Sequence, residues 1–435
     1  MILVYATAVT NRLKYTFKQL FKELLKSDVK FTSNAEEFTD YIGAKISYAR
    51  APIGDELFFK SRKLLFEKGV MDQELSVNQW KDKPCFFDVG DKSEFPFDPF
   101  AASFYLMSRY EEYLPHKRDD HGRFTANQSL AYENKFLNFP IVDFWAIQIA
   151  SAIKDRFPNF EFTKRQFTYM STIDVDNAYA YIGKGLFRNA AGLIRSMLHL
   201  NFQEAIQRLN VLRLNKRDPF DTFSYLLRQG KRYGFEYIFF FLLGDYTKYD
   251  KNVPVTSSRL RLLIKSIADD AKVGIHPSYY CQEKEGQLKK ETGRLAKIVN
   301  DEVHVSRQHY LRMTLPQTYR WLIDNDITED YTMGYPSQIG FRAGTCSAYF
   351  FYDLDLEAPT NLKVHPFAFM EGTLRDYMAI KPEQAMTHIK PLIDNVKEVN
   401  GTFISLWHND SVSNSGVWKG WKAIYEQMLK EVYEQ

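Results

Sequence analysis

The chain has 435 residues, of which 45% are hydrophobic and 26% are charged, and its formal net charge is +3. This composition is typical of a soluble globular protein, and the near-neutral charge gives no indication of wholesale nucleic-acid binding. The length exceeds that of one ordinary core and predicts two or three domains. Three scattered cysteines (Cys85, Cys281 and Cys346) form neither a disulfide framework nor a zinc–thiolate motif.

The first segment of the chain is apolar, and its charged residues follow the apolar run rather than precede it. Because it also lacks a small-residue cleavage site, we interpret it as a strand and not as a signal peptide. No apolar run reaches the ~18 residues that a membrane-spanning helix needs. The sequence therefore predicts a cytoplasmic protein.

Residues 1–160 mix short strand-like and helix-like segments without a regular alternation, which predicts an α+β accessory domain. A proline-punctuated stretch at 94–100 precedes a helix-like run at 101–114. His116 and His121 lie in a charged turn without metal-ligand spacing, so we interpret them as solvated loop residues.

From residue 167 onward, strand-like and helix-like segments alternate. This rhythm favours a parallel sheet or barrel. The expected strands are 167–173, 237–243, 272–275, 302–305, 330–333, 339–342, 363–369 and 402–407. The expected helices are 221–233, 257–270, 283–300, 316–325 and 382–399.

One insertion, residues 183–217, breaks this rhythm. It holds seven basic residues against the single acid Glu204, and its apolar residues recur at helical spacing. A basic amphipathic segment can lie on an anionic membrane surface or bind an anionic ligand. The alternative is a helical hairpin with a solvated face.

The first strand of the alternating region ends in two carboxylates, Asp174 and Asp176. Strand alternation points both to the same side, where their charges repel. A divalent cation bound to one acid, with the other acting as a base beside it, would remove this conflict. The alternative is an Asp-rich turn that caps the next element.

Other expected strands also run into polar residues. Catalytic groups of α/β folds gather at the carboxyl ends of strands. The residues in these positions are Asp174, Asp176, His276, Arg307, His309, Arg342 and His408.

Over residues 165–435 these motifs resemble the polysaccharide deacetylases, the NodB-homology family of metal-dependent carbohydrate esterases. The resemblance rests on the Asp174/Asp176 strand end, on GIHPS at 274–278, on GFRAGT at 340–345 and on LWH at 406–408. It implies an α/β fold: a distorted (β/α) barrel at 161–435, with the insertion at 183–217. The α+β domain of residues 1–160 precedes this barrel in the chain.

The resemblance also implies a role for each matched residue. Asp174 is expected to be the general base and Asp176 a metal ligand. His276 is expected to be a second ligand, Arg342 to orient the base, and His408 to be the general acid.

The chain departs from the family pattern in its second motif. The family has two histidines one helical turn apart, whereas Tyr280 stands four residues after His276. The nearest replacement ligand is His309, which follows another expected strand. His304 falls inside that strand and is expected to pack there.

The resemblance implies removal of an acetyl group from an N-acetylated saccharide. One carboxylate and two imidazoles suit the divalent ion that such a hydrolysis uses. Zn is the first expectation, and Co, Ni, Fe or Mn would also fit. The alternatives are a non-catalytic glycan-binding protein that lost a ligand at Tyr280, and a deacylase of a non-sugar amide. We also expect peripheral contact with the inner membrane surface, or with a lipid-linked glycan, through residues 183–217.

Overall fold

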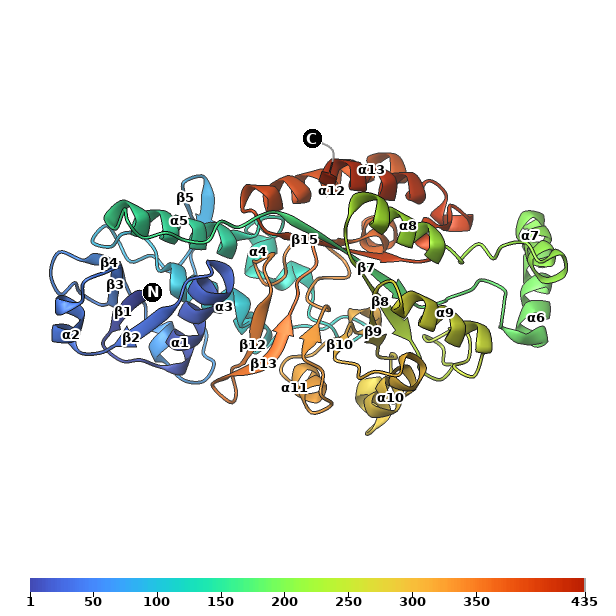
Figure 1. Cartoon of the computed structure of the whole chain (residues 1–435), viewed down its shortest axis with the longest axis horizontal. Helices are drawn as coiled ribbons and strands as arrows, with labels where there is room; N and C mark the ends of the chain where they lie inside the picture. Colours follow the sequence, from blue (N-terminus) through green and yellow to red (C-terminus); the bar gives the residue numbers. More distant parts are fainter. Residues whose placement is uncertain (434–435) are drawn as a thin grey trace.

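The computed structural model describes residues 1–433, in which a four-stranded and a nine-stranded sheet are flanked by helices (Figure 1). The N-terminal sheet has the order β2-β1-β3-β4, and all of its strand pairs are parallel. Its strands are β1 (Ile2–Ala6), β2 (Val29–Thr32), β3 (Lys45–Ala49) and β4 (Leu57–Lys60). The apolar segment that opens the chain is thus a buried strand, as predicted.

Helices α1 (Asn11–Phe17), α2 (Ala35–Asp40), α3 (Pro99–Met107), α4 (Leu130–Glu133) and α5 (Ile141–Arg156) accompany this sheet, with the short hairpin β5 (Asn78–Trp80) and β6 (Lys83–Cys85). Helix α3 begins at Pro99 because the Asp98 side chain accepts hydrogen bonds from the first free backbone N–H groups. Phe100 of α3 stacks on Phe17 with ring centroids 4.0 Å apart. Much of the aromatic content therefore serves this core.

The second sheet has nine strands in the order β12-β13-β11-β10-β9-β8-β7-β15-β14. All neighbours are parallel except the pair β12–β13. The strands are β7 (Thr168–Val175), β8 (Tyr237–Leu242), β9 (Lys272–His276), β10 (Val305–Ser306), β11 (Glu329–Asp330), β12 (Tyr349–Asp353), β13 (Ala358–Val364), β14 (Phe369–Met370) and β15 (Thr402–His408).

The predicted α/β class is confirmed. Closure into a barrel is not shown, because the hydrogen-bonded order of the described residues ends at β12 on one side and at β14 on the other.

Four strand predictions differ from the structure. The expected strands 302–305 and 330–333 correspond only to the two-residue strands β10 and β11. Residues 339–342 form a loop, in which Gly340 has a φ of 119° and the N–H of Phe341 donates to the carbonyl of Leu137. The segment 363–369 is divided between β13 and β14, because Pro366 between them has no N–H to donate to a ladder.

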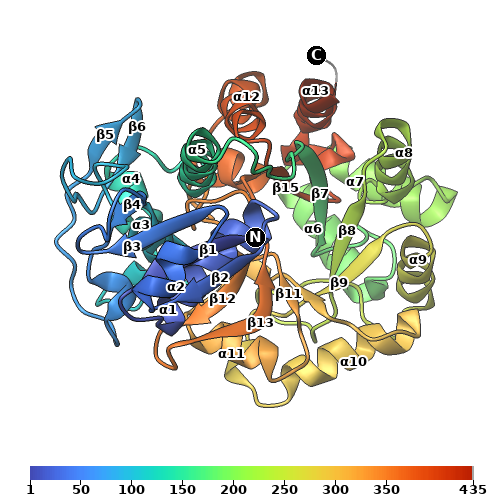
Figure 2. The ribbon, with the colours of Figure 1, turned by 60° about the vertical axis from the view of Figure 1, so that its left-hand side comes forward.

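Long helices cover the outside of the nine-stranded sheet (Figure 2). They are α8 (Phe223–Tyr233), α9 (Ser258–Ala268), α10 (Gln287–Val299), α11 (Gln317–Ile323), α12 (Pro382–Glu398) and α13 (Trp421–Tyr433). In α12 the buried residues Ile389, Leu392 and Val396 recur at helical spacing. Each such apolar stripe fixes the face that its helix turns inward.

The insertion forms two helices, α6 (Gly185–Leu198) and α7 (Phe202–Leu214), that contact each other and stand out from the body (Figure 1, right). None of the described helices combines the length and the apolar character needed to cross a bilayer.

Candidate metal centre

The candidate site lies at the carboxyl ends of neighbouring parallel strands. Asp174 is the next-to-last residue of β7, and Asp176 directly follows that strand. His276 ends β9 and His408 ends β15, where it pairs in register with Asp174. His309 follows β10 in the short turn η6 (His309–Leu311). The sheet therefore brings these five side chains to one edge.

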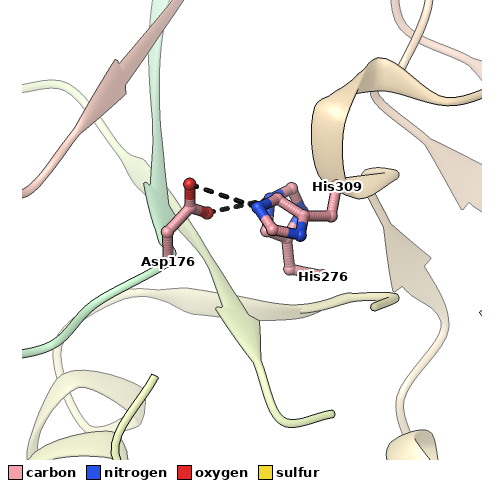
Figure 3. Close-up of side chains that lie close together, drawn as sticks. All are labelled: Asp176, His276 and His309. Carbon is pink, nitrogen blue, oxygen red and sulfur yellow. Dashed lines mark ion pairs between the residues drawn. The ribbon is translucent and has the colours of Figure 1, made fainter. Parts of the chain in front are cut away.

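Three of these residues form a cluster suited to a cation (Figure 3). One ligand atom from each of Asp176, His276 and His309 lies within 4.8 Å of the other two. Nε2 of His276 is 3.2 Å from Oδ1 of Asp176, and Nε2 of His309 is 3.4 Å from Oδ2. Both histidines are buried.

Both imidazoles are held in place through their Nδ1 atoms. The Nδ1 of His276 lies at hydrogen-bond distance from the carbonyl of Arg307, and the Nδ1 of His309 lies 2.9 Å from Oδ1 of Asp250. These bonds use the Nδ1 proton and leave Nε2 free to ligate. Oδ1 of Asp176 is buried and has no hydrogen-bond partner among the described residues. The donor set therefore fits a divalent cation with open coordination positions.

The electrostatics of the cluster agree with this fit. Burial alone would lower the pKa of His309, but Asp176 and Asp250 outweigh it and raise that pKa to about 9. Burial would raise the pKa of Asp176, but His309 and His276 hold it well below its usual range. Both shifts show that the carboxylates favour a positive charge at this position.

Asp174 lies beside the cluster. Its Oδ2 is 3.7 Å from Nε2 of His276, and its Oδ1 accepts a hydrogen bond of 3.1 Å from Arg307. Arg307 is fully buried and also donates to Thr172 and to the carbonyl of Tyr331. Asp174 is thus held in one orientation by a fixed guanidinium.

The prediction that Arg342 orients Asp174 is wrong. Nε and Nη2 of Arg342 bind the two carboxylate oxygens of Glu112 at 2.9 and 2.6 Å, and Nη1 donates to the carbonyl of Gly334. Burial would raise the pKa of Glu112, yet Arg342 and Arg109 lower it to about 2. Because residues 339–342 form a loop against the N-terminal region, this arginine serves a buried structural ion pair.

His408 is fixed by a carboxylate that the sequence analysis missed. Its Nδ1 lies 2.8 Å from Oε1 of Glu371, which is fully buried just after β14. Its Nε2 lies 3.8 Å from Oδ2 of Asp176. Burial would lower the pKa of His408, but Glu371, Asp176 and Asp174 raise it well above its ordinary value. The sequence signal for Glu371 was weak, because β14 has only two residues.

A cavity of about 310 Å³ opens over these residues. Aromatic side chains from separate loops contribute to its wall: Tyr249, Tyr310, Tyr377 and Trp418. Arg123, from the N-terminal part of the chain, also lines it. His121 is not solvated as predicted, since its Nδ1 lies 3.0 Å from the hydroxyl of Tyr279 and its ring contacts Tyr310.

His304 lies outside the site. It precedes β10, is partly exposed and approaches Glu302 at 3.1 Å, so the prediction that it packs inside a strand is wrong.

Comparisons with known proteins give little at the level of sequence. Residues 2–158 match the model of a family of unknown function (DUF7033). No curated protein matches the chain.

Similar solved structures are polysaccharide deacetylases. A protein from Mycobacterium smegmatis, whose name assigns it provisionally to this family, is 13% identical with a TM-score of 0.40, over 63% of this chain and 86% of its own. A polysaccharide deacetylase from Bacillus cereus is 12% identical with a TM-score of 0.31, over 62% and 88%. A CE4 family pseudoenzyme from Bacillus anthracis is 13% identical with a TM-score of 0.30, over 62% and 63%.

The resemblance to polysaccharide deacetylases that the motifs indicate is thus also found among solved structures.

Proposed function

We propose that this chain is a metal-dependent hydrolase that removes an acetyl group from an N-acetylated saccharide. The observation that carries this proposal is the cluster of Asp176, His276 and His309, with Asp174 and His408 each within 4 Å of one of its members. These are the groups that metal-assisted amide hydrolysis needs, gathered at one cavity.

In this proposal Asp176, His276 and His309 hold a divalent ion, which supplies a Lewis acid for the acyl oxygen and acidifies the attacking water. Asp174 takes the proton of that water as general base. Arg307 keeps Asp174 oriented through its 3.1 Å hydrogen bond.

His408 supplies the second proton transfer. Its neighbours raise its pKa and so favour the protonated form, which can donate from Nε2 to the departing nitrogen. Glu371 holds Nδ1 and positions the ring. Water adds to the acyl carbon, the C–N bond breaks, and acetate and the free amine leave.

The saccharide assignment is supported by the motif resemblance and by the cavity wall. Tyr249, Tyr310, Tyr377 and Trp418 offer flat apolar faces with polar edges, which suit a sugar ring. The barrel, and the division into an accessory domain of residues 1–160 and a catalytic domain of residues 161–435, belong to the same proposal. In it the accessory domain contributes Arg123 to the cavity.

The test compares two neighbouring carboxylates. Purified protein is assayed for bound metal and for acetate release from N-acetylglucosamine oligosaccharides. Asp174→Asn should keep the metal and lose activity by about 10²- to 10⁴-fold, the usual cost of removing a general base. Asp176→Ala should lose both metal and activity.

Equal metal loss in the two variants would contradict the assigned roles. Wild-type protein that binds metal and oligosaccharide without releasing acetate would instead support the non-catalytic glycan-binding alternative. Release of acetate from simple amides but not from saccharides would support a non-sugar deacylase.

A further inference from the structure

The hairpin of α6 and α7 (residues 185–214) exposes most of its large apolar side chains. Eleven of the large apolar side chains that the described residues expose lie in this segment: Leu186, Phe187, Ile194, Met197, Leu198, Leu200, Phe202, Ile206, Leu209, Leu212 and Leu214. A helical pair in a soluble body normally turns such residues inward. In this hairpin the apolar face is not covered by any other segment among the described residues.

Polar groups fill much of the contact between the two helices. Arg208 is buried, approaches the small residue Gly192 and binds Glu204 at 2.9 Å. It also lies 4.6 Å from the ring of Tyr181, and Ser196 is buried nearby on α6. The helices are therefore held in one orientation, and that orientation leaves the apolar side outward.

The exposed side of α6 is a continuous stripe. Phe187, Ile194 and Leu198 follow one another at seven and four residues, which is the spacing of one helical face. Phe187 is 93% exposed and Leu198 is 78% exposed. On α7 the exposed residues Phe202, Ile206 and Leu209 recur at the same kind of spacing.

Cations accompany this apolar surface. Arg195, Arg213 and Lys216 are exposed, and none of them forms an ion pair within residues 1–433. The single acid of the segment, Glu204, is already bound to Arg208. The surface thus combines apolar residues with unneutralised positive charge and offers no free negative charge.

We infer that the hairpin docks the protein on an anionic lipid bilayer. Apolar residues on one face with Arg and Lys beside them form the pattern of helices that lie in the membrane interface. A second copy of the chain would suit the apolar residues, but its hairpin carries the same cations and no free carboxylate to neutralise them. The projection of the hairpin from the body leaves it free to reach a plane (Figure 1).

The hairpin also adjoins the candidate metal centre. A second cavity of about 770 Å³ is lined by Lys184, Gln207 and Arg208 of the insertion, and it shares Asp410 and Trp418 with the cavity over the metal cluster. Docking through the hairpin would therefore hold the mouth of the site near the lipid surface.

The experiment measures co-sedimentation of the full-length protein with vesicles of phosphatidylcholine alone or mixed with phosphatidylglycerol, at low and high salt. Wild-type protein should bind the anionic vesicles, less at high salt, because salt screens exposed charges. The triple variant Arg195→Gln, Arg213→Gln, Lys216→Gln should bind on the order of 10²-fold more weakly, about fivefold per cation. The triple variant Phe187→Ser, Ile194→Ser, Leu198→Ser should lose binding at all salt concentrations.

The matched control is Leu262→Ser with Lys265→Gln on α9, which removes an exposed leucine and an exposed lysine elsewhere and should leave binding unchanged. Equal unfolding midpoints and equal metal content show that each variant is folded. The inference is overturned if wild-type protein binds no vesicles, or if the control weakens binding as much as the hairpin variants do. It is also overturned if the apolar variant merely converts a dimer to a monomer.

Metal content and acetate release from soluble oligosaccharides should stay unchanged in both hairpin variants. Failure of membrane docking and failure of the proposed activity are therefore separate results.

Discussion

Two buried arginines show how residues of one type serve different ends. Arg307 donates to Asp174 within the site, whereas Arg342 binds Glu112 at the boundary with the N-terminal region. Arg307 follows one segment expected to be a strand and Arg342 ends another, so the local sequence does not separate them. The path of the chain in the folded structure decides which carboxylate each arginine binds.

Substitution of each arginine by glutamine should separate a role in orienting Asp174 from a role in stabilising the fold. Arg307→Gln should lower turnover by on the order of 10²-fold with metal retained, because a misplaced base loses its reactive geometry. Arg342→Gln should destabilise the fold by about 3 kcal/mol, since it leaves part of a buried carboxylate unpaired. Specific activity per metal-loaded molecule checks the first expectation, and urea unfolding checks the second. A larger loss of specific activity in Arg342→Gln than in Arg307→Gln would contradict the roles assigned to the two arginines.

Glu371 should set the alkaline limit of activity. His408 must be protonated to donate, and the carboxylate of Glu371 raises its pKa. Glu371→Gln removes that negative charge, so the pKa of His408 falls and the protonated form disappears at a lower pH. The alkaline limb of kcat/KM against pH should therefore move to lower pH, with metal content unchanged. An alkaline limb that does not move in Glu371→Gln would show that this limb does not report the titration of His408.

At the scale of elements, strong periodic segments were predicted and weak ones were not. The apolar run before Asp174 and the stripe of α12 identified their elements within a few residues. Strand β14 has two residues and β12 runs antiparallel at the edge, so neither carries a clear pattern. Arg307 was recognised as a strand-end residue but not assigned, because its partner depends on the order of strands in the sheet.

The position of His309 beside His276 follows from the same sheet. Strands β9 and β10 are neighbours, so His309, which follows β10, lies close to His276 at the end of β9. His309→Ala should lower metal affinity by on the order of 10²-fold or more, because even supporting residues cost 10- to 100-fold. His304→Ala, just before β10 and outside the cluster, is the matched control and should keep wild-type affinity in a competitive chelator titration. Equal losses would refute a ligand role for His309.

At the scale of the molecule, the N-terminal region is joined to the nine-stranded sheet by buried polar contacts. Arg12 binds Glu357, Arg342 binds Glu112, and Tyr15 donates to the carbonyl of Phe350. One continuous apolar core includes residues of both sheets. The N-terminal region therefore supports the site as well as lining it through Arg123.

Because the proposed ligands come from β7, β9 and β10, bound metal should stabilise the whole molecule. A ligand that binds only the folded state adds about 2.7 kcal/mol at a concentration of about 100 Kd. Protein stripped with a chelator should therefore unfold several degrees lower, and restored metal should recover the wild-type Tm. Asp176→Ala supplies the control, since it lacks the carboxylate that both imidazoles face. A shift of the same size in Asp176→Ala would place the stabilising metal elsewhere, and no shift in the wild type would contradict a metal held by these three strands.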